Sequence, residues 1–421
     1  MWRKRFQIIV ALMGFTLLIA SLSFAAGTYV AEHPGGAVAS RLPFYDASMN
    51  VAHVPPSAGV PDGLEEQFAV FWDVWRIVEN DFFGETDRQA MIQGAIKGMV
   101  DALGDPYTQY IDPQQNAIMR EDDSGGFEGI GATVDMIDGR LTIISPLKGS
   151  PADRAGLKAG DVVLEVDGRP VKDMDLIEAV SLVRGPKDST VTLTIQRKGV
   201  PEPFKVSIVR AKIPLISVDG RMLSDQIGYL AIRSFSGRTV QELDKHLAEL
   251  EAEGAKALIL DLRGNPGGFL DAAVETVSRF VDQGPALWWE NADGSSYPIE
   301  VKPRHTFEGP VVVLIDEGSA SASEIVAGAL QDYHRATLIG TQSFGKGSVQ
   351  NVHQLRDGGS VRVTTAHWLT PDRHEINGVG LMPDIYVAQD DTHPELDIQL
   401  SFAHRVLRNR IGVPRHTPFF K

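Results

Sequence analysis

Two short stretches of the chain carry residues that can supply a nucleophile and a base. The first is the run of small residues Gly318-Ser319-Ala320-Ser321-Ala322-Ser323, and the second is Phe344-Gly345-Lys346-Gly347. A hydroxyl is a weak nucleophile until a nearby base takes its proton, and a lysine becomes such a base when burial lowers its pKa. Glycines on both sides of Lys346 would let the backbone pack closely around a buried amine. Each stretch also has an ordinary interpretation, since serines often cap helices and most lysines are solvated.

The flanking segments predict a sharp corner between a strand and a helix. The apolar run Pro310–Ile315 is typical of a buried strand, and a helical pattern follows the serines. A strand that turns through small residues into a helix exposes a side chain at the corner, with backbone N–H groups pointing outward. A short apolar strand, Ala336–Ile339, then leads towards the glycine-flanked lysine. We therefore expect the corner to present a nucleophilic hydroxyl.

Together the two stretches resemble the active site of the carboxyl-terminal processing proteases, also called tail-specific proteases. In that family a serine in a Ser-Ala-Ser-Ala-Ser-Glu context is followed 25 positions later by a lysine in Phe-Gly-Lys-Gly, and a glutamine stands four positions further on; Ser321, Lys346 and Gln350 hold those positions here. The resemblance implies an exported serine endopeptidase with Ser321 as nucleophile and Lys346 as general base. If Lys346 lies on extended backbone, Gln350 points to the same side and would orient the lysine amine. The resemblance implies neither a metal nor a cofactor.

Lysine serves as a base only in an unusual environment. Its reference pKa is about 10.4, so the pKa must fall by roughly 3 units for work near neutrality, at a cost of about 4 kcal/mol. Burial beside Ser321 would supply that desolvation. A histidine base is the alternative, and the spacing leaves five histidines open, none of them in a recognisable triad context. They are His305, His334, His353, His367 and His374.

The resemblance also implies an oxyanion hole made of backbone N–H groups. Its donors would be Ala322, directly after the nucleophile, and Gly267, the first of the paired glycines in Arg263-Gly264-Asn265-Pro266-Gly267-Gly268. Taken alone, this loop is an ordinary tight turn between a strand and a helix. Asp332 matches an acidic position of the family, and we expect it to be structural. The family usually continues after Thr370-Pro371 with a small residue and a glycine, whereas this chain has Asp372-Arg373, a departure at the expected rim of the substrate groove.

Residues 127–212 change to a strand-like period of two and resemble a PDZ domain, which binds an extended peptide by adding it as a strand to a sheet edge. In the family, the loop Gly129-Ile130-Gly131-Ala132 captures a terminal carboxylate on successive N–H groups. The expected partners are therefore proteins or peptides with free C-termini. Arg184, at the end of the expected helix, either contacts the catalytic domain or is a solvated cation. We expect strands at Gly131–Met136, Leu141–Ser145, Asp161–Val166 and Thr190–Arg197, and a helix at Leu176–Val183.

The expected fold class is a multidomain α/β protein whose catalytic core is crotonase-like or Clp-protease-like, as the resemblance implies. Alternating strands and helices after residue 213 predict parallel pairing with both faces of the sheet covered. The expected domains are 1–30, signal anchor or signal peptide; 31–63, flexible linker; 64–126, helical N-terminal region; 127–212, PDZ domain; 213–390, catalytic domain; and 391–421, C-terminal helix and tail.

The N-terminal third predicts export and a possible oligomer. Arg3, Lys4 and Arg5 precede the uncharged segment Phe6–Val30, which suits a signal peptide or an uncleaved membrane anchor. The remaining chain would then be extracytoplasmic, in the periplasm or cell envelope and held at the inner or cytoplasmic membrane. The helical pattern from Leu64 to about Ala102 has an apolar stripe of the kind found in cores or partner-helix faces, which allows a homo-oligomer through this region.

Composition removes several other classes of function. The formal charge of −15 leaves no basic excess for a nucleic-acid partner, and the absence of cysteine excludes disulfides, thiolate catalysis and Cys-ligated zinc. Two alternatives stay open: a catalytically weak PDZ scaffold that regulates other envelope proteases, and a crotonase-like enzyme acting on acyl thioesters. A decayed scaffold would be expected to lack Ser321 or Lys346, and both are present. The acyl-thioester interpretation gives no reason for an exported PDZ domain.

Overall fold

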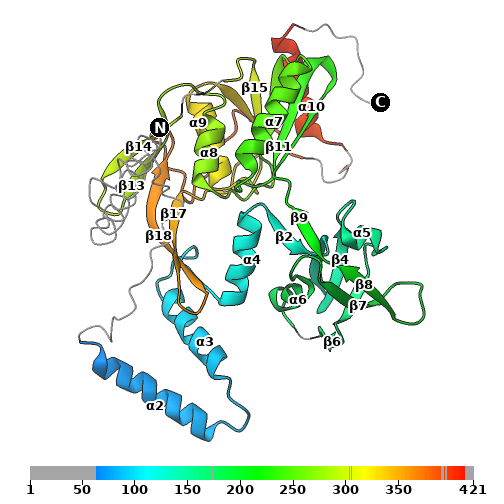
Figure 1. Cartoon of the computed structure of the whole chain (residues 1–421). Helices are drawn as coiled ribbons and strands as arrows, with labels where there is room; N and C mark the ends of the chain where they lie inside the picture. Colours follow the sequence, from blue (N-terminus) through cyan, green and yellow to red (C-terminus); the bar gives the residue numbers. More distant parts are fainter. Residues whose placement is uncertain are drawn as a thin grey trace, which may run out of the picture. The chain divides into compact units, whose positions relative to one another are not determined.

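The computed structural model describes residues 63–412, except 173, 303, 305, 390–392, 394 and 395 (Figure 1). Residues 1–62, which hold the expected anchor and nearly all of the expected linker, lie outside the described residues. His305 and the tail after residue 412 do so too. Within the described part, no helix has the length and apolar character needed to span a bilayer.

The catalytic segment is built on one six-stranded, mostly parallel sheet. In spatial order its strands are β10 (Val218–Met222), β11 (Ile227–Ile232), β12 (Ala257–Asp261), β15 (Val311–Ile315), β16 (Ala336–Gly340) and β19 (Ile385–Tyr386). All neighbours pair in parallel except β10, which runs antiparallel to β11 at one edge. Every residue of β11, β12 and β15 is buried, as a parallel sheet with both faces covered requires. The parallel alternation expected from the sequence is confirmed.

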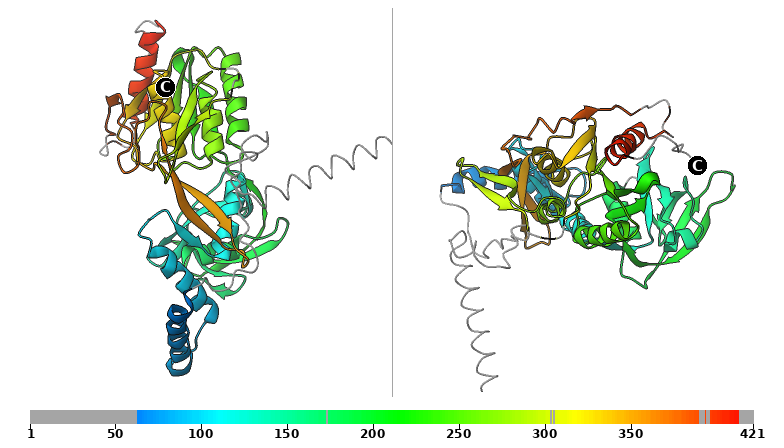
Figure 2. Two further views of the ribbon diagram at one scale, coloured as in Figure 1. Left: turned by 90° about the vertical axis from the view of Figure 1, so that its left-hand side faces the viewer. Right: turned by 90° about the horizontal axis from the view of Figure 1, so that it is seen from above.

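Helices cover both faces of this sheet (Figure 1; Figure 2, left). On one face pack α7 (Thr239–Ala252), α8 (Leu270–Val277) and α9 (Ala322–Asp332), which share a core with alternate side chains of the strands. On the other face α10 (Ile398–Arg410) buries Ala403 and Leu407 against the opposite side chains of β12 and β15. The residues at the carboxyl ends of β12 and β15 are thereby held between two layers of helices.

A second, five-stranded antiparallel sheet joins distant parts of the chain. It contains β1 (Gln109–Ile111), β18 (Ser360–Leu369), β13 (Pro285–Asn291), β14 (Ser296–Glu300) and β17 (Ser348–Gln354). Strand β1 pairs with β18 in the register Gln109↔Arg362, and β17 pairs with β18 on the other side. This pairing carries the turn that precedes β1 to the strand that follows Lys346.

The helical N-terminal region consists of α2 (Glu65–Asp81), α3 (Arg88–Asp101) and α4 (Pro113–Asp123). The helical pattern from Leu64 to Ala102 is therefore divided in two, and Asp87 caps α3 by accepting the N–H groups of Gln89 and Ala90. Helix α2 has no buried residue, and its apolar stripe is exposed, with Trp72 48% and Ile77 58% accessible. This stripe lacks a partner within the described residues of the chain.

The PDZ segment has a hydrophobic core of its own. Its strands are β2 (Gly126–Gly129), β3 (Ala132–Ile137), β4 (Arg140–Pro146), β5 (Val162–Val166), β6 (Arg169–Pro170), β7 (Thr190–Gln196), β8 (Phe204–Val209) and β9 (Ala211–Pro214), and its helices are α5 (Pro151–Arg154) and α6 (Leu176–Val183). The main sheet has the order β3-β4-β5-β7-β8, so β3 is an edge strand. The core includes Leu141, Ile143 and Leu193.

In the catalytic segment a short 3-10 helix, η3 (Ser224–Gln226), joins β10 to β11.

Candidate active site

Ser321 stands at the corner between β15 and α9, as the sequence predicted. Its backbone has φ 54° and ψ −114°, outside the regions that a non-glycine residue normally occupies. Such strain costs about 1–3 kcal/mol and persists only where the surroundings fix it. Two contacts do so here: Ser319 Oγ donates to the carbonyl of Leu262 at 2.9 Å, and the Ala320 N–H donates to the carbonyl of Asn265 at 3.0 Å. The corner is therefore fastened to the loop that follows β12.

The paired glycines of that loop lie directly against the corner. A Cβ on Gly267 would come within 2.8 Å of both the Ala320 carbonyl and Ser321 Cβ, and the φ of Gly267 is 102°. Only glycine fits there. The Gly267 N–H already donates to Asn265 Oδ1 at 2.9 Å. For the Ala322 N–H we find no acceptor in the described residues. The N–H of Ala322 is thus available to donate to an oxyanion. The N–H of Gly267 would first have to break its hydrogen bond to Asn265 Oδ1.

Glu324 joins the nucleophile segment to the base segment. Its carboxylate is fully buried on the first turn of α9. One oxygen accepts the N–H of Ser321 at 2.8 Å and the N–H of Lys346 at 2.9 Å. The other accepts the hydroxyl of Ser343 at 2.6 Å and the N–H of Gly345 at 2.7 Å. In the sequence analysis Glu324 appeared only as the last residue of the family motif. Its place as the third residue of a helix that begins after a serine cap is the sequence pattern that could have identified it.

The environment of Lys346 lowers the pKa of its amine. The side chain is half-buried, and Nζ lies 5.0 Å from the centre of the Tyr107 ring. Burial lowers the pKa of Lys346, and nearby Arg362 lowers it further, while the carboxylates of Asp105 and Glu324 oppose the shift. Within the described residues, no hydrogen bond joins Nζ to the hydroxyl of Ser321. The link that the structure shows between the two residues runs through their backbone N–H groups and the carboxylate of Glu324.

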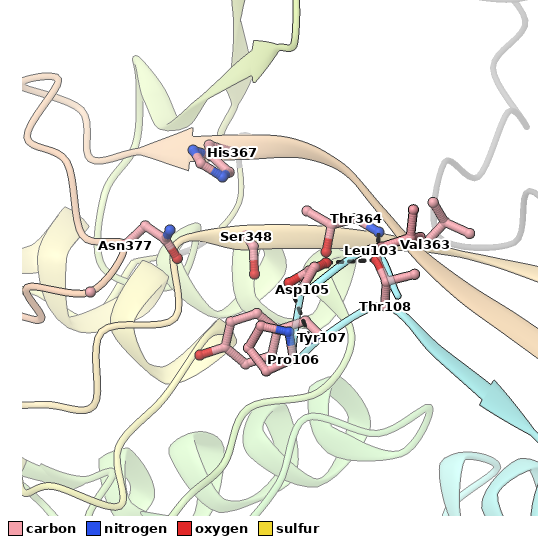
Figure 3. Close-up of a pocket in the computed structure, with 11 residues that line it drawn as sticks. Leu103, Asp105, Pro106, Tyr107, Thr108, Ser348, Val363, Thr364, His367 and Asn377 are labelled. Carbon is pink, nitrogen blue, oxygen red and sulfur yellow. Dashed lines mark hydrogen bonds between the residues drawn. The ribbon is translucent and has the colours of Figure 1, made fainter. Parts of the chain in front are cut away.

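A cavity of about 550 Å³ opens beside Tyr107 (Figure 3). Its walls come from the turn after α3 and from β17 and β18, and include Leu103, Asp105, Tyr107, Ser348, Thr364 and His367. Asp105 accepts the hydroxyl of Thr108 at 2.6 Å and the N–H of Tyr107 at 3.2 Å. Burial raises the pKa of Asp105, but hydrogen bonds from Thr108, Thr364 and the backbone outweigh it and keep the pKa below its usual value. The cavity therefore holds a carboxylate at neutral pH.

Gln350 lies on β17, and within the described part of the chain no hydrogen bond joins it to the lysine amine. Its side-chain amide donates to Ser348 Oγ at 2.9 Å and to Thr364 Oγ1 at 3.2 Å. A bulge between Val349 and Gln350 changes the strand's register just before it. In this structure Gln350 orders the hydroxyl-lined wall of the cavity.

The candidate histidines are spread over the catalytic segment. His367 lines the cavity, and His374 Nδ1 lies 3.3 Å from Asp332. Among the described residues, no histidine forms a hydrogen bond with Ser321. Asp332 also accepts the N–H of Asp372 at 2.8 Å, a pattern that suits the expected structural role. The guanidinium of Arg373 lies 3.7 Å over the Trp288 ring, so the Asp372-Arg373 departure fastens this loop to β13.

A buried ionic cluster fastens the other side of the Gly267 loop. Arg263 bonds Asp261 at the end of β12 and Asp397 at the start of α10, with distances of 2.7 and 2.8 Å. Tyr229 donates to Asp261 at 2.7 Å, and its pKa is raised to about 12, first by burial and then by that carboxylate. The C-terminal helix thus contacts the first residue of the loop, which sequence reasoning did not foresee because Asp397 lies 134 residues away.

The expected carboxylate loop of the PDZ segment lies between β2 and β3. Ile130 is buried, and a Cβ on Gly131 would meet Ser150 at 2.5 Å, so the loop is tightly packed. The N–H groups of Ile130 and Gly131 find no acceptor in the part of the chain that the structure describes. Ala132 opens β3, whose outer edge is unpaired. These features suit the capture of a chain end.

Arg184 forms ion pairs with helix α4. From the sequence we expected Arg184 either to contact the catalytic domain or to be a solvated cation. It bonds Glu121 at 3.2 Å and Asp122 at 2.9 Å, both on α4, and lies 4.3 Å over the Phe127 ring. Its side chain is only 16% exposed, so it is not a solvated cation.

Comparisons with known proteins match three parts of the chain to known families. Residues 226–387 match peptidase family S41, residues 142–197 match the PDZ domain, and residues 25–115 match the family described as the activating protease CtpB N-terminal domain. The carboxy-terminal processing protease CtpB of Bacillus subtilis is 36% identical over 86% of this chain and 76% of its own length. CtpA of the same organism is 41% identical over 73% of this chain, and the chain spans 66% of that relative.

A relative and a solved structure extend the comparison. The carboxy-terminal-processing protease of Bartonella bacilliformis is 38% identical over 82% of this chain and 81% of its own length. The solved photosystem II D1 C-terminal processing protease is 30% identical, with a TM-score of 0.49, and the alignment covers 82% of this chain and 97% of that one.

Proposed function

Since the chain belongs to the S41 peptidase family that includes the carboxy-terminal processing proteases, we propose that it is an exported endopeptidase that cleaves near the C-terminal tail of protein substrates with a Ser321/Lys346 dyad. The observation that carries the proposal is the buried carboxylate of Glu324, which accepts the backbone N–H groups of both residues. This bond network holds the backbones of the two segments together, which supports a shared role for their side chains.

The mechanism begins when the neutral amine of Lys346 takes the proton of the Ser321 hydroxyl. Ser321 Oγ attacks the scissile carbonyl, and the developing oxyanion receives the N–H of Ala322. Gly267 adds a second N–H once it releases Asn265. Each donor of this type lowers the activation free energy by about 2.7–4 kcal/mol. Lys346 then returns the proton to the leaving amine, and water releases the acyl group from Ser321.

The PDZ segment would supply the selection of chain ends. A free carboxylate binds the N–H groups around Ile130 and Gly131, and the preceding residues add to the open edge of β3. Binding at this site holds the tail near the dyad and makes cleavage effectively intramolecular. The substrates would therefore be proteins with exposed, unmodified C-termini.

The location and assembly follow from the N-terminal third. The basic residues before Phe6 and the apolar segment after them support export with the catalytic part outside the cytoplasm. The exposed stripe of α2 supports a homo-oligomer in which the stripe packs on a second copy. The scaffold alternative has no observation in its favour, because the site retains both dyad residues and the buried bonds that align them.

Three variants test the dyad. Ser321→Ala and Lys346→Ala should each abolish cleavage of a peptide with a free C-terminus while leaving the circular dichroism spectrum and the Tm unchanged. The double variant should be no worse than either single one, because the two residues act as a unit. Substantial turnover by pure Lys346→Ala would remove lysine as the base and return attention to the histidines.

A further inference from the structure

The turn between α3 and β1 reaches the catalytic lysine, although it belongs to the helical N-terminal region. Tyr107 of this turn lies beneath Lys346 Nζ, 5.0 Å from the ring centre. Tyr107 and Lys346 lie far apart in the sequence. The pairing of β1 with β18 brings them together. Tyr107 also falls outside residues 226–387, the part of the chain that matches the peptidase family. Its contact with the base is therefore a property of how this N-terminal turn docks.

The turn is held rigidly enough to place the ring. Asp105 accepts the Tyr107 N–H at 3.2 Å and the Thr108 hydroxyl at 2.6 Å. Thr108 Oγ1 in turn accepts the N–H of Thr364 on β18 at 3.0 Å. Figure 3 shows Asp105, Thr108 and Thr364 gathered at one end of the cavity, with Tyr107 beside them. The ring position is thus fixed by bonds to β18, which pairs with β17, the strand that follows Lys346.

An aromatic face attracts an ammonium but not a neutral amine. The ring therefore stabilises protonated Lys346 at a place where Nζ has no hydrogen bond to Ser321 in the described structure. The other charged groups that face this amine are Asp105 on the same turn, Glu324 on α9 and Arg362 on β18. The two carboxylates also favour the protonated amine, whereas the guanidinium disfavours it.

We propose that Tyr107 is a positioning residue for Lys346, holding the protonated amine on its ring and releasing it to Ser321 when the amine loses its proton. This inference rests on the proposed function of Lys346 as the base. The turn would then set the pH at which the peptidase becomes active.

The test compares Tyr107→Leu with Tyr107→Phe in the full-length protein. Leucine keeps an apolar side chain but removes the aromatic face, whereas phenylalanine keeps the face. In Tyr107→Leu the rising limb of the kcat/KM profile should move to lower pH by roughly 0.4 to 1.5 units. The reason is that loss of a cation–π contact of this kind lowers the pKa of the amine by that amount. Tyr107→Phe should stay within about 0.3 units of the parent, the resolution of such a profile.

A second readout does not depend on turnover. In a Ser321→Ala background, competitive acetylation of Lys346 measured by mass spectrometry across pH gives the pKa of the amine directly. Tyr107→Leu should lower this pKa by the same amount, and Tyr107→Phe should not. An unshifted Lys346 pKa in folded Tyr107→Leu, or an equal shift in both variants, would overturn the inference. A shifted amine in a protein without Ser321-dependent cleavage would support the hold of the ring on the protonated amine, but it would reject the proposed function and with it the release to Ser321.

Discussion

Replacing Glu324 by glutamine should loosen the link between nucleophile and base. The carboxylate is fully buried and accepts four donors, two on each oxygen: the N–H groups of Ser321 and Lys346 on one, and the N–H of Gly345 with the hydroxyl of Ser343 on the other. Glutamine has nearly the same shape but only one acceptor oxygen. Its NH₂ group must therefore face one pair of donors.

The least costly arrangement turns the NH₂ towards Ser343 and Gly345. The hydroxyl of Ser343 can rotate to accept, but the N–H of Gly345 loses its only acceptor, at a cost of about 1–3 kcal/mol. The bonds from Ser321 and Lys346 survive as neutral bonds, each weaker by about 1 kcal/mol than a bond to a charged acceptor. The sum is a loss of about 3–5 kcal/mol in the free energy of unfolding.

The assay measures this loss by urea unfolding and compares peptide cleavage at a temperature where the variant is folded. Because Lys346 and Ser321 are aligned through Glu324, we expect kcat to fall at least about tenfold, which corresponds to roughly 1.4 kcal/mol. Glu317→Gln is the matched control, since it removes the same charge from an exposed position in the turn that leads into α9 and should cost less than about 0.5 kcal/mol. Glu324→Gln with stability within about 1 kcal/mol of the parent and an unchanged kcat would refute this reasoning.

The remaining predictions concern the base, the oxyanion hole and the chain end. Since the neutral amine is the active form and the pKa of Lys346 is lowered by burial, kcat/KM should rise with pH through that lowered pKa. No single histidine should be needed; a loss as large as that of Ser321→Ala in one of the folded variants of His305, His334, His353, His367 or His374 would reject the lysine mechanism. Gly267→Ala should reduce kcat at least about a hundredfold by pushing on Ser321 and the oxyanion donors, and activity equal to the parent would show that the loop tolerates a Cβ. Amidation of the substrate's C-terminus should lower kcat/KM more than tenfold, about 1.4 kcal/mol, and equal cleavage of free and amidated peptides would show that the PDZ loop does not read chain ends.

The sequence predicted the catalytic sheet well because its strands and helices carry strong periodic signals. The expected strand Pro310–Ile315 contains β15 (Val311–Ile315), and the expected strand Ala336–Ile339 is β16, which ends one residue later at Gly340. Continuous apolar runs identify strands that are buried on both faces. The corner that holds Ser321 was foreseen for the same reason, since a buried strand, small residues and a helix follow one another without interruption.

The five-stranded sheet was not foreseen, and the contacts around Lys346 depend on it. Strand β17 has mostly half-buried, largely polar side chains, so it shows neither a continuous apolar run nor a clean alternation. The partner of β18 at its other edge, β1, comes from the N-terminal region about 250 residues earlier, as the bond from Tyr110 to Asp357 across 247 positions illustrates. No local sequence pattern predicts the pairing of two strands so far apart in the chain. The roles of Tyr107 and Glu324 therefore emerge only from the folded chain.

Covalent labelling with a serine-reactive fluorophosphonate, located by mass spectrometry, tests the dyad most directly. Ser319 and Ser323 are buried, and their hydroxyls donate to the carbonyls of Leu262 and Asn265. The account therefore predicts a single adduct on Ser321, formed faster as pH rises and at least about a hundredfold more slowly in Lys346→Ala. An adduct on another serine, or equal labelling rates in the parent and Lys346→Ala, would contradict it.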